Sequence, residues 1–217
     1  MIRIVIVDDH DLVRAGLRAI LEQDSLFEVV GETGDGQDAI RLVARVKPDV
    51  VLMDVHLPGG IGGLEATETI VKDNAEAKVI ILTQYEDREY IRRALRIGAR
   101  GYLLKRSVAS QLKDAVRTVH AGQRYLHPSV ADELVDLVTA GRSIDEAEDD
   151  YDRLTPREKQ VFTLLAEGKT SRDIAKYLTI SLKTAMTHRT NIMEKLNMHS
   201  RAELIRYAVR KAIIPLN

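Results

Sequence analysis

Short apolar runs alternate with longer amphipathic segments along the first ~125 residues of the chain. The apolar runs are rich in Val and Ile and nearly continuous, which is typical of strands buried on both faces of a parallel sheet. They cover residues 2–7, 29–31, 50–53, 79–82 and 101–104. The segments with helical spacing cover residues 12–21, 37–46, 64–74, 88–97 and 110–121. This alternation predicts an α/β domain: an open, five-stranded parallel sheet with helices on both faces.

The pattern changes after this region and predicts a linker followed by a second, all-helical domain. The linker contains an amphipathic segment at residues 128–140 and an acidic stretch at residues 145–152. From Leu154 to the end, the chain has the spacing of four short helices. We therefore expect a first domain at residues 1–125, a linker at residues 126–152 and a helical domain at residues 153–217.

The second and third of these helices have the spacing of a helix-turn-helix. A tight turn at residues 179–181 separates a short helix from a longer one predicted at residues 182–196. The longer helix would bury Ala185, Ile192 and Leu196 and turn a polar, basic side outward. The alternative is a small helical bundle with a basic surface.

Charge separates the two domains. From Tyr151 to the end there are 13 Lys and Arg against 6 Asp and Glu, a net charge of +7. Residues 1–150 hold the remaining 19 basic and 27 acidic residues, a net charge of −8. A basic module on an acidic body suggests a polyanionic partner for that module, although a solvated basic surface is the simpler alternative. We also consider that the acidic stretch at 145–152 competes for the basic face.

The composition indicates where in the cell the protein is expected. Hydrophobic residues make up 45% and charged residues 30% of the chain, as in ordinary globular proteins. No apolar run approaches the roughly 18 residues that span a bilayer, and Asp8 and Asp9 interrupt any signal sequence. The absence of cysteine excludes disulfides and thiolate metal sites. We therefore expect a cytoplasmic protein with no membrane association.

Residues suited to phosphoryl transfer fall where the predicted strands end. Asp8 and Asp9 follow the first strand, Asp54 the third, Thr83 the fourth and Lys105 the fifth. The ends of parallel strands meet at one edge of the sheet, so these side chains should converge there. Three crowded carboxylates need a cation, and hard oxygen ligands favour Mg²⁺. A carboxylate beside Mg²⁺ can attack a phosphoryl group, while the metal and an ammonium offset the developing charge.

The motifs at these strand ends, IVDDH, VVLMD, LT and GYLLK, resemble the receiver domain of two-component response regulators. The resemblance implies that Asp8 and Asp9 bind Mg²⁺ together with Asp54, which accepts a phosphoryl group from a histidine kinase. It implies that Thr83 and Lys105 bind that phosphoryl group. The stretches GGLEAT and GQRY resemble the GacA/UvrY branch of these regulators.

Two further positions follow from the same resemblance. Tyr102 matches the aromatic residue of the family that moves when Asp54 is phosphorylated, together with Thr83. His56 matches the position whose backbone carbonyl binds the metal. The His56 side chain could also be interpreted as a metal ligand or a catalytic group, but we favour an exposed loop histidine.

The segment LTPREKQVFTLLAEGKTSRDIAKYLTISLKTAMTHRTNIMEKLNMHSRAELIRYAV resembles the LuxR-type DNA-binding domain of the NarL/FixJ family. The resemblance implies that the third helix lies in the major groove and that the fourth forms a dimer contact. The residues placed for the phosphate backbone are Lys183, Thr184, His188, Arg189 and Lys195. Those placed for base edges are Met186, Thr187 and Thr190. Those placed for the dimer contact are Leu204, Tyr207, Ala208 and Lys211.

Met186 departs from the family pattern, which often has Lys or Glu there. A methionine cannot make the bidentate hydrogen bonds that read guanine. The alternative is that Met186 packs against a neighbouring helix. The operator therefore cannot be copied from a relative.

We expect a DNA-binding transcriptional regulator of a two-component system, controlled by a population shift on phosphorylation of Asp54. Its partners would be promoter DNA, a histidine kinase and a second copy of the chain. It would not be an enzyme, beyond Mg²⁺-dependent self-phosphorylation and slow loss of the phosphoryl group. A stand-alone phosphohydrolase is disfavoured because His56, not an acid, stands two residues after Asp54. A module that works without phosphorylation is disfavoured by the intact set of strand-end residues.

Overall fold

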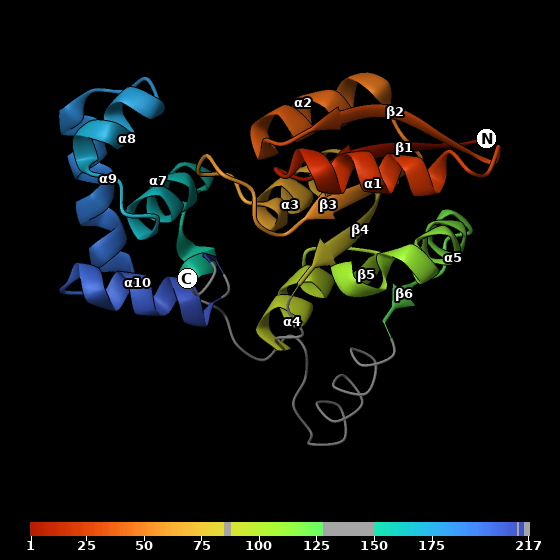
Figure 1. Ribbon diagram of the computed structural model, residues 1–217. Coiled ribbons are helices and arrows are strands. Elements are labelled where there is room, and N and C mark those ends of the chain that lie inside the picture. Colours follow the sequence, from red (N-terminus) through yellow and green to blue (C-terminus); the bar gives the residue numbers. More distant parts are fainter. Residues whose placement is uncertain (85–87, 128–149, 212, 215–217) are drawn as a thin grey trace, which may run out of the picture. The chain divides into compact units, whose positions relative to one another are not determined.

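The computed structural model describes residues 1–84, 88–127, 150–211 and 213–214. The chain forms two compact units, the first containing strands β1 to β6 and the second helices α7 to α10 (Figure 1). The amphipathic helix expected at residues 128–140 and most of the acidic stretch lie outside the described residues. So does the hypothesis that this stretch competes for the basic face.

The first unit is built on a parallel sheet in the order β2-β1-β3-β4-β5-β6. The strands are β1 Ile2–Val7, β2 Phe27–Thr33, β3 Val50–Asp54, β4 Lys78–Thr83, β5 Gly101–Leu104 and β6 Tyr125–Leu126. The prediction of a parallel α/β sheet is confirmed, with a correction from five strands to six. Strand β6 was missed because its two residues are too few to show a periodic pattern.

Helices cover both faces of this sheet (Figure 1). They are α1 Asp11–Leu21, α2 Gly36–Val46, α3 Gly63–Asp73, α4 Arg88–Arg96 and α5 Val108–His120. Helices α1 and α5 share one apolar core with alternate strand residues such as Ile4 and Ile6 of β1. The intervening Val5 and Val7 are fully buried as well. Successive strand residues point to opposite faces, so a strand that is apolar throughout must be covered on both sides.

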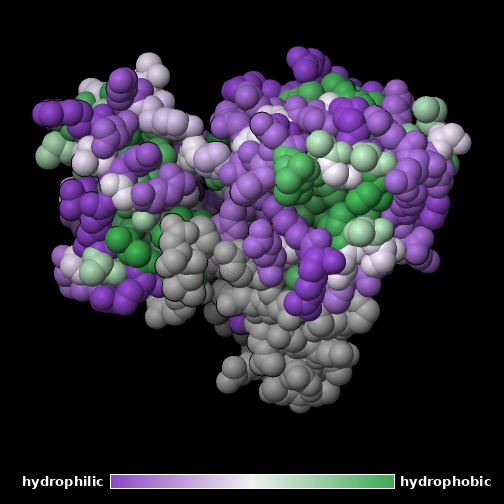
Figure 2. Space-filling model, in the orientation of Figure 1, coloured by the Kyte–Doolittle hydropathy of each residue, from purple (hydrophilic) through white to green (hydrophobic). Residues whose placement is uncertain are grey.

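Helix α1 leaves apolar side chains at the edge of this core. Leu12 is 85% exposed, whereas Val13 and Ile20 are partly buried and pack against the core. Figure 2 shows apolar atoms gathered on the face of the first unit that carries α1 in Figure 1. Within the described ranges, no helix is both long and apolar enough to cross a membrane.

The second unit consists of four helices preceded by a short 3-10 turn, η2 Asp150–Arg153. The helices are α7 Pro156–Ala166, α8 Ser171–Tyr177, α9 Leu182–Lys195 and α10 Arg201–Arg210. Each is started by a Ser or Thr whose side chain accepts a hydrogen bond from the third backbone N–H of the helix. These caps are Thr155, Thr170, Ser181 and Ser200. Such caps satisfy backbone donors that have no partner inside the helix, so they fix where each helix begins.

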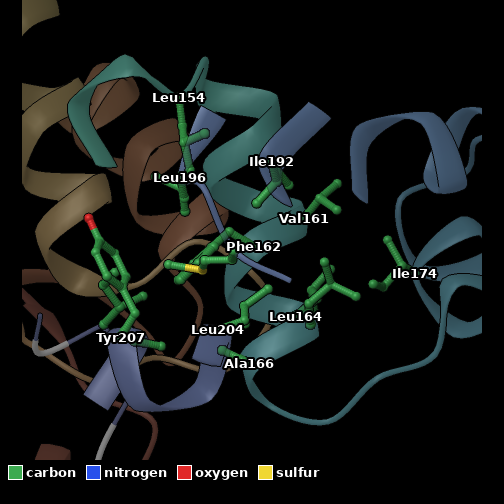
Figure 3. Packing of buried hydrophobic residues seen from close by; sticks show 14 of the residues in the cluster. Leu154, Val161, Phe162, Leu164, Ala166, Ile174, Ile192, Leu196, Leu204 and Tyr207 are labelled. Atoms are coloured by element: carbon green, nitrogen blue, oxygen red, sulfur yellow. The ribbon is translucent and has the colours of Figure 1, made fainter. Parts of the chain in front are cut away.

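The core of the second unit surrounds Phe162 of α7 (Figure 3). Its ring makes edge-to-face contacts with Tyr151 at 5.3 Å and Tyr207 at 6.0 Å between centroids. The predicted buried side of α9 is confirmed, since Ala185, Ile192 and Leu196 are at most 7% exposed.

The same core corrects the predicted dimer contact. Leu204, Tyr207 and Ala208 of α10 are only 2%, 9% and 0% exposed, and Figure 3 shows the first two pointing into the core. The Tyr207 hydroxyl also accepts a hydrogen bond from the Tyr151 backbone N–H at 3.1 Å. Buried side chains offer no surface to a second copy. Lys211, just after α10, stays partly exposed.

Gly63 fixes how α3 begins beside the end of β3. A Cβ atom added at Gly63 would lie 1.7 Å from the Asp54 carbonyl oxygen. The Gly63 backbone N–H donates to the Val55 carbonyl at 2.9 Å, so the helix start cannot easily move away. Only glycine allows this close approach.

We expect Gly63→Ala to lower the free energy of unfolding by about 1–3 kcal/mol, because the added methyl must displace backbone. The control is Gly16→Ala in α1, where an added Cβ meets nothing within 4 Å. That variant should gain about 0.5–1 kcal/mol from helix propensity. Urea denaturation of the full chain measures both, and equal effects would contradict the packing role of Gly63.

Candidate functional site

The structure brings three predicted residues into direct contact at the carboxyl edge of the sheet. Asp8 follows β1 and Asp54 ends β3, and they are 0% and 4% exposed. The Lys105 Nζ atom lies 2.7 Å from Asp8 Oδ2 and 2.9 Å from Asp54 Oδ2. Strands β1 and β3 are adjacent in the sheet, where the strand order reverses. Open α/β sheets bind their ligands at such a reversal.

Strand register explains why Thr83 lies near this cluster. Asp54 pairs with Leu82, so Thr83 follows directly beyond it on β4. Thr83 in turn pairs with Leu104, the residue before Lys105. Thr83 is 1% exposed and Tyr102 is 0% exposed. Tyr102 is therefore already fully buried in this conformation.

Asp9 and His10 complete a cluster suited to a metal ion. One ligand atom from each of Asp8, Asp9, His10 and Asp54 lies within 4.8 Å of the others. Asp8 Oδ2 is buried and accepts no directed hydrogen bond from the described residues, although Lys105 contacts it ionically. The three carboxylates fit a hard divalent cation such as Mg²⁺. The sequence analysis did not predict that His10 belongs to this cluster. Its position directly after Asp8 and Asp9 could have indicated it.

The electrostatics of the cluster favour a compensating cation. Burial raises the pKa of Asp54 to about 6, Lys105 opposes the rise, and repulsion from Asp8 adds to it. Burial also disfavours the charged form of Lys105, but the Asp54 and Asp8 carboxylates outweigh it and raise the Lys105 pKa. One ammonium thus serves two buried carboxylates, and a metal ion would relieve the excess negative charge.

His56 is partly buried, contrary to the exposed loop histidine expected from the sequence. Its Nε2 atom lies 2.8 Å from the hydroxyl of Tyr90 on α4. Burial, with a smaller effect of Lys105, lowers the pKa of His56 to about 4, so the imidazole is neutral at physiological pH. A second link to α4 is the well-buried ion pair between Glu65 and Arg93 at 2.5 Å. The segment after Asp54 is therefore tied to α4 by two polar contacts.

The predicted DNA-contacting residues lie along α9. Most of these side chains are exposed, and His188 is partly exposed. Met186 is 55% exposed, so it is not a core residue of the second unit. Lys195 differs, because its ammonium donates a 2.6 Å hydrogen bond to the buried carboxylate of Glu158. Lys195 thus ties the end of α9 to the start of α7.

The chain thus combines a carboxylate cluster at the edge of a parallel sheet with a helix-turn-helix unit. A family model described as response regulator receiver domain matches residues 4–117. A second, described as bacterial regulatory proteins, luxR family, matches residues 152–208. The chain therefore belongs to the response regulators, as a transcription regulator of a two-component system and not a catalytic enzyme. Its receiver implies a histidine kinase partner, and its LuxR-type domain binds DNA.

Relatives resemble the chain over nearly its whole length. The oxygen regulatory protein NreC of Staphylococcus carnosus is 40% identical over 98% of this chain and 99% of its own. NreC of Staphylococcus aureus matches to the same extent. The structure of two RcsB dimers bound to two parallel DNAs is 26% identical, with a TM-score of 0.60 over 97% of this chain and 98% of that one. ChrA of a heme-sensing system is 34% identical, with a TM-score of 0.52 over 98% of both chains.

We expect Asp54→Asn to be more thermally stable than the native chain in the absence of divalent metal. The pKa of Asp54 lies near 6 in the folded state, above its ordinary value of 3.8. The folded chain then holds more protons than the unfolded chain between these values, so stability falls as the pH rises through about 6. Asp54→Asn has no ionisable carboxyl group at this position, so its stability should not fall as the pH rises through this range.

Thermal melts in chelator between about pH 5 and pH 8 measure the effect. The control is Asp114→Asn, which removes a carboxylate of α5 that is 74% exposed. Added Mg²⁺ should stabilise the native chain and the control more than Asp54→Asn. The same pH dependence in all three proteins would show that the Asp54 carboxylate does not carry it.

Proposed function

We propose that Asp54 accepts a phosphoryl group from a histidine kinase with Mg²⁺, and that phosphorylation controls binding of α9 to promoter DNA. The observation that carries this proposal is the pair of contacts from Lys105 to Asp8 and Asp54 at 2.7 and 2.9 Å. The carboxylates of Asp8, Asp9 and Asp54, with the backbone carbonyl of His56, would hold the metal. Bound Mg²⁺ supplies charge neutralisation for the incoming phosphoryl oxygens.

The residues around Asp54 have separate roles in this proposal. The Asp54 carboxylate would attack the phosphorus while the P–N bond to the kinase histidine breaks and its electron pair returns to the imidazole nitrogen. Lys105 would transfer one of its ionic contacts to a phosphoryl oxygen. The Thr83 hydroxyl donates a hydrogen bond to the same group. Small phosphodonors can replace the kinase, which gives slow self-phosphorylation and slow release without the turnover of an enzyme.

Helix α4 is the element that we propose to respond, together with Thr83 and Tyr102. The His56–Tyr90 hydrogen bond and the Glu65–Arg93 ion pair join it to the segment after Asp54. A phosphoryl group at Asp54 changes the charge beside these links and so shifts the balance between two positions of α4.

The proposed DNA interface uses the exposed part of α9. Its backbone-contacting residues are Lys183, Thr184, His188 and Arg189, and its base-contacting residues are Met186, Thr187 and Thr190. Lys195 is assigned a structural role instead, because Glu158 holds its ammonium. We propose domain limits of 1–125 and 153–217, joined by a linker at 126–152, and a location in the cytoplasm, where promoter DNA lies.

We propose that the chain binds DNA as a dimer through the outer face of α10. Ala202 is exposed, and Ile205 and Val209 are partly exposed, at spacings that place them on one side of the helix. We assign the contact to this apolar side because Leu204, Tyr207 and Ala208 are buried in the core. The dimers seen in the RcsB–DNA structure support a dimeric arrangement.

Beryllofluoride with Mg²⁺, which mimics a phosphoryl group on aspartate, tests the switch. We expect it to move the full chain toward dimer on gel filtration and to tighten binding to duplexes selected from a random-sequence library. Asp54→Asn should show neither response, because the acceptor carboxylate is gone. Equal DNA affinity with and without beryllofluoride would reject phosphorylation control but leave DNA binding intact.

Lys183→Ala tests the phosphate contact. We expect weaker binding to all duplex sequences and a salt dependence flattened by about 0.9 per bound protomer, the contribution of one phosphate contact. Lys195→Ala is the matched control, since it removes a lysine of the same helix that is paired with Glu158. It should lower the melting temperature and leave the salt slope unchanged. An unchanged slope for Lys183→Ala would remove this residue from the interface.

A further inference from the structure

The exposed side of α9 carries large apolar side chains where a DNA-binding helix would carry polar ones. Leu182 is 42% exposed and Met186 is 55% exposed. They stand four residues apart, so they lie one above the other on the helix, with Thr190 one turn further on. A shallow groove runs along this side. It is lined by Leu182, Lys183, Met186, Thr187, Thr190 and Asn191.

The two threonines of this groove turn their hydroxyl protons back to the helix. Thr187 Oγ1 donates to the Lys183 carbonyl at 3.0 Å, and Thr190 Oγ1 donates to the Met186 carbonyl at 3.2 Å. Each hydroxyl has one proton, so neither threonine can donate to a base while these bonds hold. What they offer outward is a methyl group and an oxygen that only accepts.

This chemistry selects among base pairs. Guanine presents two acceptors in the major groove and needs donors such as Arg or Lys, whereas thymine presents a C5-methyl group. Leu182, Met186 and the two threonine methyl groups offer apolar contact and no donor. Asn191, in the same groove, is a residue type that can pair with the adenine edge through two hydrogen bonds. Both features favour A·T pairs.

We propose that Leu182, Met186, Thr187 and Thr190 form an apolar stripe that recognises thymine methyl groups in the major groove. The proposal rests on the proposed DNA-binding role of α9. Charge identifies the occupant, because exposed Lys183 and Arg189 lie on the same helix and the segment from Tyr151 carries a net charge of +7. Positively charged residues around the stripe are complementary to the phosphates of a DNA duplex. An apolar protein partner would gain nothing from them.

The test compares thymine with uracil, which pairs identically but lacks the methyl group. Duplexes are selected from a random-sequence library with the full chain in beryllofluoride and Mg²⁺, then resynthesised with uracil in place of thymine. We expect A·T pairs in the selected half-sites and about fourfold weaker binding for each contacted methyl group removed, the value for burying one such group. The salt dependence should not change, since no phosphate contact is lost.

Substitutions of Met186 localise the effect. Met186→Ala should weaken binding to the thymine duplex and reduce the difference between thymine and uracil duplexes. Met186→Leu keeps an apolar side chain and should retain most of that difference. Because Met186 is 55% exposed, both variants should melt at the native temperature, which confirms that folding is intact.

The possible outcomes distinguish failure of the apolar-stripe proposal from failure of the proposed DNA-binding role of α9. Sequence-selective binding with equal affinity for thymine and uracil duplexes would overturn the stripe and leave the DNA-binding role standing. Selected half-sites made of G·C pairs would do the same. Failure to bind any duplex would instead reject the proposed role of α9 itself. A full uracil penalty in Met186→Ala would overturn the proposed stripe, because Met186 is the more exposed of its two large apolar side chains.

Discussion

The contact of one ammonium with two buried carboxylates is the interaction around which the site of the first unit is built. Parallel strands carry Asp8 and Asp54 to the same edge of the sheet, and Lys105 lies within 3 Å of both. One positive charge cannot balance them, so the site retains excess negative charge in a buried place. A divalent cation, or protonation of the Asp54 carboxylate, relieves this imbalance. The fold thus holds these carboxylates in a state that responds to metal and to pH.

The second unit contains a buried carboxylate with the opposite behaviour. Burial disfavours the charged form of Glu158, but hydrogen bonds from Lys195 and Thr155 prevail and lower its pKa. Every close partner of this carboxylate is a donor, whereas Asp54 has another carboxylate beside it. A buried carboxylate is therefore held ionised in one unit and disfavoured as an anion in the other. Burial raises the pKa of both groups, but only the neighbours of Glu158 outweigh it.

Local patterns predicted much of the fold and part of the site. The apolar runs matched β1 and β5 residue for residue, and the Thr-Pro pair marked the start of α7. Strand-end positions indicated the acidic cluster because parallel topology forces them together. The link between His56 and Tyr90 joins residues 34 positions apart, and no local pattern encodes such a contact. The apolar positions of α10 were misassigned because a core face and a dimer face have the same periodicity.

The ion pair of Lys195 with Glu158 has a consequence for how the second unit meets its ligand. It fixes one end of α9, while the Ser181 cap fixes the other and the buried Ile192 anchors the middle. The helix is therefore ordered before DNA arrives, and little conformational entropy is lost on binding. Different promoters would then be encountered at similar rates and distinguished by how long the protein stays on each.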